Sequence, residues 1–185
     1  MVQSISKNIT QESINLDWSS KVYELIKIKN IKLIASVPDG GLTKLLNLLE
    51  ADKDITVVTL ATEEEGIALL AGGWIGGVRG LMLMQSSGVG NTINMLSLPI
   101  QCRIPFLTLV TMRGQWGEFN PWQITMGQAV PKVFEAMGLT VYPVEKEEDV
   151  DKTFSATADY VFNTGKSAAI LVGQRIIGAK SFEEN

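Results

Sequence analysis

The sequence predicts an α/β fold, a doubly wound and mainly parallel six-stranded sheet with helices on both faces. Six short runs rich in Val, Ile, Leu and Met are hydrophobic almost throughout, as expected for strands that are covered on both faces. Longer segments with helical periodicity separate these runs, so that strands and helices alternate along the chain. This alternation is typical of a parallel sheet in which a helix connects each strand to the next.

The predicted strands are residues 31–37, 54–60, 80–85, 105–111, 139–144 and 168–173. The predicted helices are residues 18–29, 41–51, 63–77, 90–98, 127–137 and 147–163. A chain of 185 residues is long enough for one domain with a full core and short for two, so we expect a single domain over residues 1–185 with its core at about 17–175. The first dozen residues and the final KSFEEN are expected to be mobile.

Composition and charge argue against several classes of function. Sixteen Lys and Arg against twenty Asp and Glu give a net charge of -4, and no basic cluster interleaves with aromatic residues, so nucleic acid is not an expected partner. The longest apolar run, residues 66–84, contains Arg79 and six glycines, whereas a membrane-spanning helix needs roughly 20 apolar residues, so no membrane span is expected. The chain has no histidine, so any catalysis depends on carboxylates, amides, hydroxyls or a cofactor, and no metal site is predicted.

The cellular location is predicted from two features. Cys102 is the only cysteine and cannot form an internal disulfide. The N-terminal segment lacks the apolar stretch of a secretion signal. A cytoplasmic location is therefore expected.

In a doubly wound sheet, ligands bind at the carboxyl ends of the strands, where loops lead into helices. The loops of this kind are residues 38–41 (PDGG), 61–65 (ATEEE), 86–91 (SSGVGN) and 112–127. Gly88, Gly90 and Asn91 are candidates to hold an anion on backbone amides. However, Ile93 breaks the GxGxxG spacing, and the alternative is a tight turn that needs glycine for close packing. Asp39 is a site candidate, with an ordinary turn or helix-cap aspartate as the alternative.

The segment 112–127 has no clear periodicity and is long for a connection inside a compact domain, which is typical of functional loops. Two tryptophans, Trp116 and Trp122, favour an ordered loop. The residues that are candidates to meet a polar ligand, each with simple solvation as the alternative, are Arg113, Glu118, Asn120 and Gln123.

The start of the predicted helix 63–77 combines acidic residues with an apolar helix. Thr62 and Glu65 fit a capping box, in which both side chains bond to free amides of the first turn. The helix that follows has no polar face and must be enclosed all round, which favours a second subunit packing over it. Glu64 shares a face with Ala68, Ala71 and Ile75. We expect Glu64 to point into that interface, where a carboxylate needs a partner that shares a proton.

Three segments together resemble a known domain. EEEGIALLAGGWIGG (63–77), LMLMQSSGVGNTINMLSL (81–98) and PFLTLVTMRG (105–114) are similar to the pyrimidine-binding domain of thiamine diphosphate enzymes. The sequence most closely resembles the alpha subunit of sulfopyruvate decarboxylase and the matching half of phosphonopyruvate decarboxylase, over about residues 17–175. The resemblance implies a subunit of a thiamine diphosphate-dependent 2-oxo acid decarboxylase, acting on a small acid with a second anionic group such as 3-sulfopyruvate.

The resemblance also implies roles for individual residues. The family has a glutamate nine residues before a glycine that precedes an aromatic residue, and counting back from Gly73 and Trp74 gives Glu64. Its implied role is a hydrogen bond to N1′ of the aminopyrimidine, which helps to remove the C2 proton of the cofactor. The implied cofactor contacts are Ser87, Gly88, Gly90 and Asn91. Asp39 would relay protons near the substrate, and Arg113 would bind an anionic head group.

The resemblance further implies that this chain holds half an active site. The GDG and asparagine motif that holds Mg²⁺ and the diphosphate in the family is absent here, so a separate beta subunit would supply it within a hetero-oligomer. Many relatives have a pair of histidines where this sequence reads RGQWGEFNPWQ, which leaves Glu118, Asn120 or Gln123 as substitutes. Two alternatives stay open, namely carboligation or acyl transfer by the same half-site, and a non-catalytic subunit that scaffolds or regulates a partner.

Overall fold

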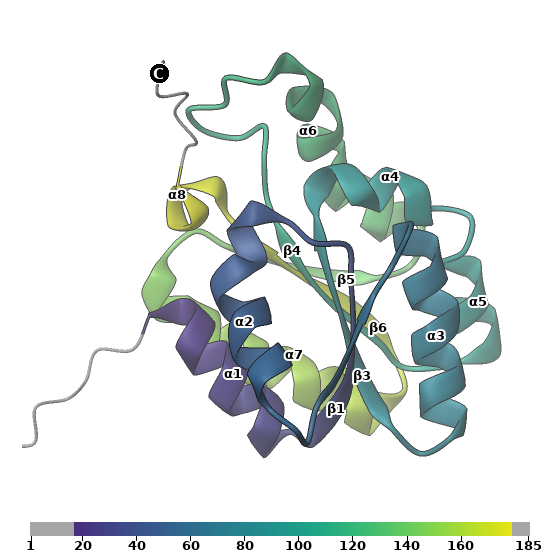
Figure 1. The fold of residues 1–185 in the computed structure, drawn as a ribbon. Coiled ribbons are helices and arrows are strands. Elements are labelled where there is room, and N and C mark those ends of the chain that lie inside the picture. Colours follow the sequence, from purple (N-terminus) through teal and green to yellow (C-terminus); the bar gives the residue numbers. More distant parts are fainter. Residues whose placement is uncertain (1–16, 179–185) are drawn as a thin grey trace, which may run out of the picture.

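The computed structural model describes residues 17–178, and both termini that were expected to be mobile lie outside this range. The six strands form one parallel sheet in the order β2-β1-β3-β4-β6-β5 (Figure 1). The strands are β1 Ile31–Ser36, β2 Thr56–Thr59, β3 Arg79–Gln85, β4 Phe106–Thr111, β5 Thr140–Val144 and β6 Ser167–Val172. The predicted fold class and all six predicted strands are confirmed, with ends that differ by one or two residues.

The helices also follow the predicted order. They are α1 Trp18–Ile28, α2 Thr43–Ala51, α3 Glu63–Ile75, α4 Val89–Thr92, α5 Ser97–Cys102, α6 Pro121–Ala136, α7 Val150–Thr164 and α8 Gln174–Ile177. Short 3₁₀ turns precede three of them: η1 Gly40–Leu42, η2 Ser86–Gly88 and η3 Glu147–Asp149. The short helix α8 was not predicted.

Two helix predictions were wrong in extent. The helix predicted at 90–98 is split into α4 and α5, because Pro99 has no N–H to donate and its ring clashes with the carbonyl four residues earlier. The helix predicted at 127–137 begins at Pro121, because Asn120 caps it by accepting a hydrogen bond from the Trp122 amide at 3.1 Å. The long loop is therefore residues 112–120, and Gln123 lies in the first turn of a helix.

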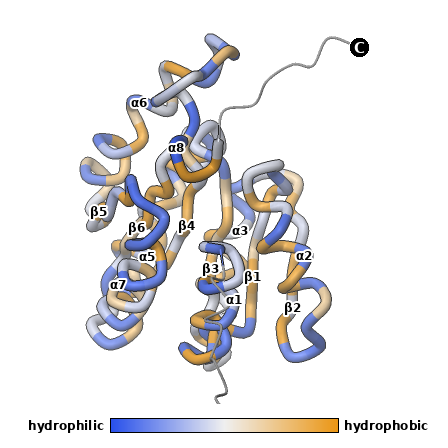
Figure 2. The backbone as a smooth tube through the Cα atoms, turned by 90° about the vertical axis from the view of Figure 1, so that its left-hand side faces the viewer, coloured by the Kyte–Doolittle hydropathy of each residue, from blue (hydrophilic) through white to orange (hydrophobic). Residues whose placement is uncertain are grey.

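The sheet has a hydrophobic core on each face. Helices α1, α2 and α7 pack on one face, where Phe154 is fully buried, and helices α3 to α6 pack on the other, where Phe134 is fully buried (Figure 1). Every residue of β4 and β6 is buried, and Figure 2 shows hydrophobic residues along the central strands. Burying a side chain of this size contributes about 1.5–3 kcal/mol, so the two cores fix the strands and the loops at their ends.

The topology predicts a crevice at the carboxyl edge of the sheet. From β1 the chain passes through α2 to the edge strand β2, whereas from β3 it passes through α4 and α5 to β4, on the other side. The loops after the adjacent strands β1 and β3 therefore leave toward opposite faces. Ligands of doubly wound sheets bind at such a point. Across residues 17–178, no helix combines the length and the apolar character that a membrane crossing requires.

Candidate active site

Asp39 lies at this edge of the sheet, in the loop after β1, and its carboxylate is held by three donors. Its Oδ2 atom accepts hydrogen bonds from the Gly41 amide at 2.9 Å and from Thr111 Oγ1 at 3.2 Å. Its Oδ1 atom accepts a hydrogen bond from Gln85 Nε2 at 2.5 Å. These donors come from the loop after β1 and from the ends of β4 and β3, so Asp39 has more partners than an isolated turn residue would need.

Gln85 was not predicted as a site residue, although one signal in the sequence could have found it. It is the polar last residue of β3, follows the apolar run 80–84 and directly precedes the SSGVGN loop. A polar residue where a buried parallel strand ends lies at the ligand-binding edge of the sheet. The Oε1 atom of Gln85 accepts a hydrogen bond from Ser87 Oγ at 2.7 Å, so Gln85 connects Asp39 with the predicted cofactor loop.

The three glutamates at the start of α3 have different surroundings. Glu63 is buried, and its Oε2 atom accepts a hydrogen bond from Asn91 Nδ2 at 2.8 Å. Glu65 is exposed, and its Oε2 atom accepts a hydrogen bond from the Ala61 amide at 3.0 Å. Glu64 is exposed, and within residues 17–178 its carboxylate has no hydrogen-bond or ion-pair partner. Of the three, Glu64 is the one free to bind something outside this chain.

The predicted capping box was wrong in its details. Thr62 is the N-cap residue of α3, but its hydroxyl accepts no hydrogen bond from the helix. Glu65 turns back to the amide of Ala61, one residue before the one a capping box requires. The first turn is instead stabilised by its three carboxylates, which the helix dipole favours at an N-terminus.

One face of α3 is open in the described chain. Its exposed row is Glu64, Ala68, Gly72 and Ile75. These positions lie on one side of the helix because their spacing is close to the helical period. Ala71, which was expected on this face, is buried, whereas Ile75 is 79% exposed. The helix is thus not enclosed by its own domain, and its enclosure by a second subunit stays a prediction.

The two glycines of the SSGVGN loop have different environments. A Cβ atom at Gly88 would lie 2.5 Å from Cδ and 2.7 Å from Cγ of Glu63, so that any larger residue at this position would require the Glu63 side chain to move. At Gly90 the nearest atom would be the sulfur of Met126 at 3.4 Å, which is an ordinary contact. Close packing therefore accounts for Gly88, and it does not account for Gly90.

The loop 112–120 is built around a buried ion pair. Arg113 is 6% exposed, and it donates from Nε to Glu118 Oε2 at 2.6 Å and from Nη2 to Glu118 Oε1 at 2.5 Å. The amides of Gly114 and Asn120 also donate to this carboxylate. The hydrogen bonds from Arg113, foremost, lower the pKa of Glu118 to about 2, and the same contact raises the pKa of Arg113. In this arrangement the guanidinium is neutralised by its own chain.

Gln123 differs from the other predicted substrate residues. Arg113, Glu118 and Asn120 are all bonded within the loop or to the first turn of α6. In the described part of the chain, Gln123 Oε1 is the buried side-chain polar atom that has no hydrogen-bond partner. Because such atoms are costly to leave unpaired, Gln123 has spare capacity for a ligand.

Gln174 was also missed, and it fastens the loop 112–120 to the sheet. It is the first residue of α8, separated from the end of β6 by Gly173, and it is fully buried. Its Oε1 atom accepts hydrogen bonds from the amides of Gln115 and Trp116 at 2.9 and 3.0 Å, and its Nε2 atom donates to Glu118 at 2.9 Å. The signal resembles that of Gln85, since Gln174 is a polar residue two positions beyond the end of a buried strand.

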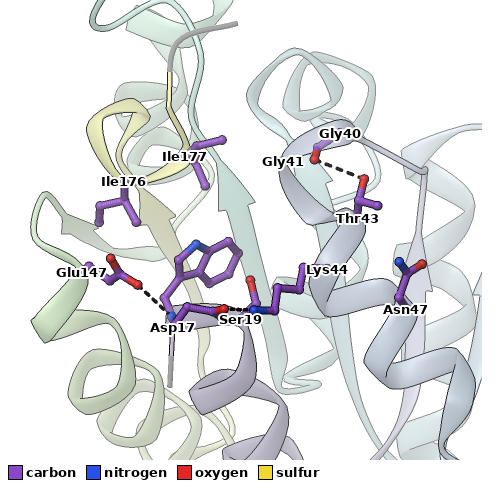
Figure 3. Close-up of a pocket in the computed structure, with 11 residues that line it drawn as sticks. Asp17, Ser19, Gly40, Gly41, Thr43, Lys44, Asn47, Glu147, Ile176 and Ile177 are labelled. Atoms are coloured by element: carbon purple, nitrogen blue, oxygen red, sulfur yellow. Dashed lines mark hydrogen bonds and ion pairs between the residues drawn. The ribbon is translucent and has the colours of Figure 1, made fainter. Parts of the chain in front are cut away.

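A separate pocket of about 540 Å³ lies beside α1, the start of α2 and α8 (Figure 3). Its wall contains Trp18, whose amide donates to Glu147 Oε1 at 3.0 Å, and the ion pair of Lys44 with Asp17. None of the predicted site residues lines this pocket. Over residues 17–178, no group of three or more Cys, Asp or Glu side chains is placed to hold a metal ion.

Comparisons with known proteins agree with this arrangement. No protein-family model matches the chain. The sulfopyruvate decarboxylase alpha subunit of Methanocaldococcus jannaschii is 34% identical over 154 residues, which cover 83% of this chain and 91% of the relative. The subunit of the same name from Methanococcus maripaludis is 34% identical over 158 residues, covering 85% and 95%. A phosphonopyruvate decarboxylase of Streptomyces hygroscopicus is 37% identical over 106 residues, which cover 56% of this chain and 26% of that enzyme.

A solved structure supports the fold independently. The 2-oxoglutarate:ferredoxin oxidoreductase of Magnetococcus marinus matches with a TM-score of 0.72 over 88% of this chain and 29% of that one. Its sequence identity is 13%, so this likeness shows the shared α/β fold alone. The 34% identity to the two alpha subunits, over 91% and 95% of their lengths, shows more. The chain belongs to the family of sulfopyruvate decarboxylase alpha subunits.

Proposed function

We propose that this chain is the pyrimidine-binding alpha subunit of a thiamine diphosphate-dependent decarboxylase. The substrate we propose is 3-sulfopyruvate, or a similar small 2-oxo acid with a second anionic group such as phosphonopyruvate, which is converted to an aldehyde and CO₂. The names of the relatives support the reaction class and the subunit organisation. The proposal includes a beta subunit that holds Mg²⁺ and the diphosphate, a hetero-oligomeric enzyme and a cytoplasmic location.

The observation that carries the proposal is the unpaired carboxylate of Glu64. Thiamine diphosphate, when bound, supplies the carbon nucleophile and the electron sink that decarboxylation of a 2-oxo acid needs. Glu64 would hold a proton shared with the aminopyrimidine ring. The surroundings fit this role, because Glu64 is exposed beside an open apolar face and no residue in 17–178 engages its carboxylate. A partner that covers this face would also exclude water from the carboxylate and strengthen its hydrogen bond.

The remaining residues would bind cofactor and substrate. In the predicted cofactor loop, Ser87 and the open Gly90 backbone are the groups with room for a ligand, while Gly88 and Asn91 would act through their contacts with Glu63. Asp39 would hold a proton near the substrate. We infer that Gln123, whose Oε1 atom lacks a partner, contacts the substrate directly. Arg113, Glu118 and Asn120 would then shape the substrate loop, with Arg113 reaching an anion only if Glu118 moves.

The test compares two neighbouring glutamates in the enzyme reconstituted from alpha and beta subunits. Glu64→Gln keeps the size of the side chain and removes its charge, and we expect about a 100-fold or greater loss of CO₂ release from 3-sulfopyruvate. Glu65→Gln is the matched control, since Glu65 bonds to the Ala61 amide, and we expect activity close to that of the wild type. Wild-type activity of Glu64→Gln would contradict the proposal.

Analysis of the products separates the two alternatives. A carboligase would give products with a new carbon–carbon bond in place of free aldehyde. A non-catalytic subunit would leave the mixture with its beta subunit unable to bind thiamine diphosphate, which isothermal titration would detect.

A further inference from the structure

We propose that Gln85 is a positioning residue, whose side-chain amide holds the Asp39 carboxylate in place and joins it to Ser87 of the predicted cofactor loop. This inference rests on the proposed function. It assigns a role to a residue at the carboxyl edge of the sheet that the sequence did not single out.

The chemistry of an amide explains why glutamine suits this position. Gln85 Nε2 donates to Asp39 Oδ1 at 2.5 Å, and Gln85 Oε1 accepts from Ser87 Oγ at 2.7 Å. An amide has donors at one end and an acceptor at the other, so it can connect a carboxylate, which only accepts, with a hydroxyl, which donates. The contact with Asp39 thereby fixes which way the amide faces. Ser87 gives its proton to Gln85, so its oxygen keeps lone pairs for a ligand.

The other contacts of Asp39 indicate what loss of the amide would do. Gly41 and Thr111 both donate to Oδ2, whereas Gln85 donates to Oδ1. Removing the Gln85 amide leaves the bonds of Oδ2 and the turn after β1 in place. It frees Oδ1, the oxygen that faces β3 and the cofactor loop. The expected consequence is a misdirected carboxylate in a folded protein.

The position of Gln85 makes it rigid enough for this role. Residues 81–84 of β3 are buried, and Gln85 is hydrogen-bonded in register with Thr111 of β4. A group placed on a central strand holds its geometry better than one in a loop. Arg113 interacts electrostatically with Asp39, and Arg113 is itself paired with Glu118. Gln85 is an uncharged residue and contacts Asp39 from the β3 side.

The first experiment uses the enzyme reconstituted with its beta subunit. Gln85→Met keeps the length of the side chain and removes both hydrogen bonds, and we expect kcat for 3-sulfopyruvate to fall about 10- to 100-fold. KM and the Kd for thiamine diphosphate should change by less than about threefold, because no binding group is removed. Gln128→Met, at an exposed position of α6, is the matched control with wild-type kinetics.

The second variant tests the pH dependence of the reaction, which would not change if Gln85 had only a structural role. Gln85→Glu places a second carboxylate against Asp39, so the pair shares a proton, and the acidic limb of the kcat/KM profile should move to higher pH by about one unit or more. A Gln85→Met enzyme with wild-type kcat, together with a Gln85→Glu enzyme with the wild-type pH profile, would overturn the proposal. Loss of activity in Glu64→Gln in the same series would still support the proposed function.

A measurement on the isolated chain tests the contact without activity. In ¹⁵N-labelled protein, Asp39→Asn should move the side-chain amide signals of Gln85, whereas Asp54→Asn, at an exposed position before β2, should leave them unchanged. Unmoved signals in Asp39→Asn would overturn the proposal. This result decides the matter even if a Gln85 variant fails to fold or the wild-type enzyme does not act on 3-sulfopyruvate.

Discussion

Glu118, in the loop 112–120, and Glu64, in the first turn of α3, are both carboxylates that follow the carboxyl ends of strands, and their surroundings are opposite. Glu118 accepts five hydrogen bonds from its own chain, and its side chain is 3% exposed. Glu64 is exposed at the end of an open row of small and apolar residues, and no residue in 17–178 binds it. The comparison teaches that a charged residue at this edge is a strong site candidate when the chain leaves it unsatisfied.

The largest effect on stability is expected when the buried, fully hydrogen-bonded carboxylate of Glu118 is removed. Glu118→Ala would leave Arg113 buried without its partner, so we expect the free energy of unfolding to fall by about 3–5 kcal/mol. Glu64→Ala, at the exposed position, should change it by less than about 1 kcal/mol. Urea denaturation of the isolated chain followed by circular dichroism measures both values. Equal midpoints for the two variants would show that the ion pair does not hold the loop.

Acid should weaken the same region. The pKa of Glu118 is about 2 in the folded chain against an ordinary value of 4.5, so its ionised form stabilises the fold fully above about pH 4.5. That contribution, of about 3 kcal/mol, is lost as the pH falls through 4.5 toward 2. Denaturation midpoints of the wild type and Glu118→Gln should therefore converge over this range. A constant difference between them would contradict the assignment.

A smaller effect separates the two glycines of the cofactor loop. Gly88→Ala should cost about 1–3 kcal/mol, because the new methyl group meets Glu63 and disturbs its bond with Asn91. Gly90→Ala should cost less than about 1 kcal/mol in the isolated chain, since its nearest contact is an ordinary one. Thermal denaturation of both variants measures the difference. If Gly90→Ala were the more damaging of the two, the packing argument for Gly88 would be wrong.

The smallest effect is expected on the exposed row of α3. Among residues 17–178, and apart from its chain neighbours and the backbone of α3, a Cβ atom at Gly72 would have no heavy atom within 4 Å, so Gly72→Ala should stabilise the isolated chain by up to about 1 kcal/mol through helix propensity. The same methyl group should weaken binding of the beta subunit if that subunit packs closely on α3. Chemical denaturation and a binding titration give the two values. Unchanged binding by the variant would place the interface elsewhere.

The fold could be predicted from the sequence because its signals are local. Near-continuous apolar runs marked all six strands, and their alternation with helices gave the parallel sheet. The boundary errors came from single residues whose effect was overlooked. Asn120 with Pro121 starts α6, and Pro99 divides the segment predicted as one helix.

The candidate site could be predicted only in outline. The loops were identified, because their place in a parallel sheet follows from topology. The pairing of Arg113 with Glu118 and the contacts of Gln85 and Gln174 depend on side-chain geometry between segments far apart in sequence. The sequence alone does not distinguish the three adjacent glutamates, and only their contacts in the structure separate Glu64 from Glu63 and Glu65.

The exposed row on α3 has a consequence for how such a protein is made. A subunit produced in excess would expose Ile75, together with Val78 three residues later in the chain, to every other molecule in the cell. Surfaces of this kind favour unwanted association. Synthesis of the two polypeptides at the same time and in equal amounts would protect the chain from aggregation before it is assembled.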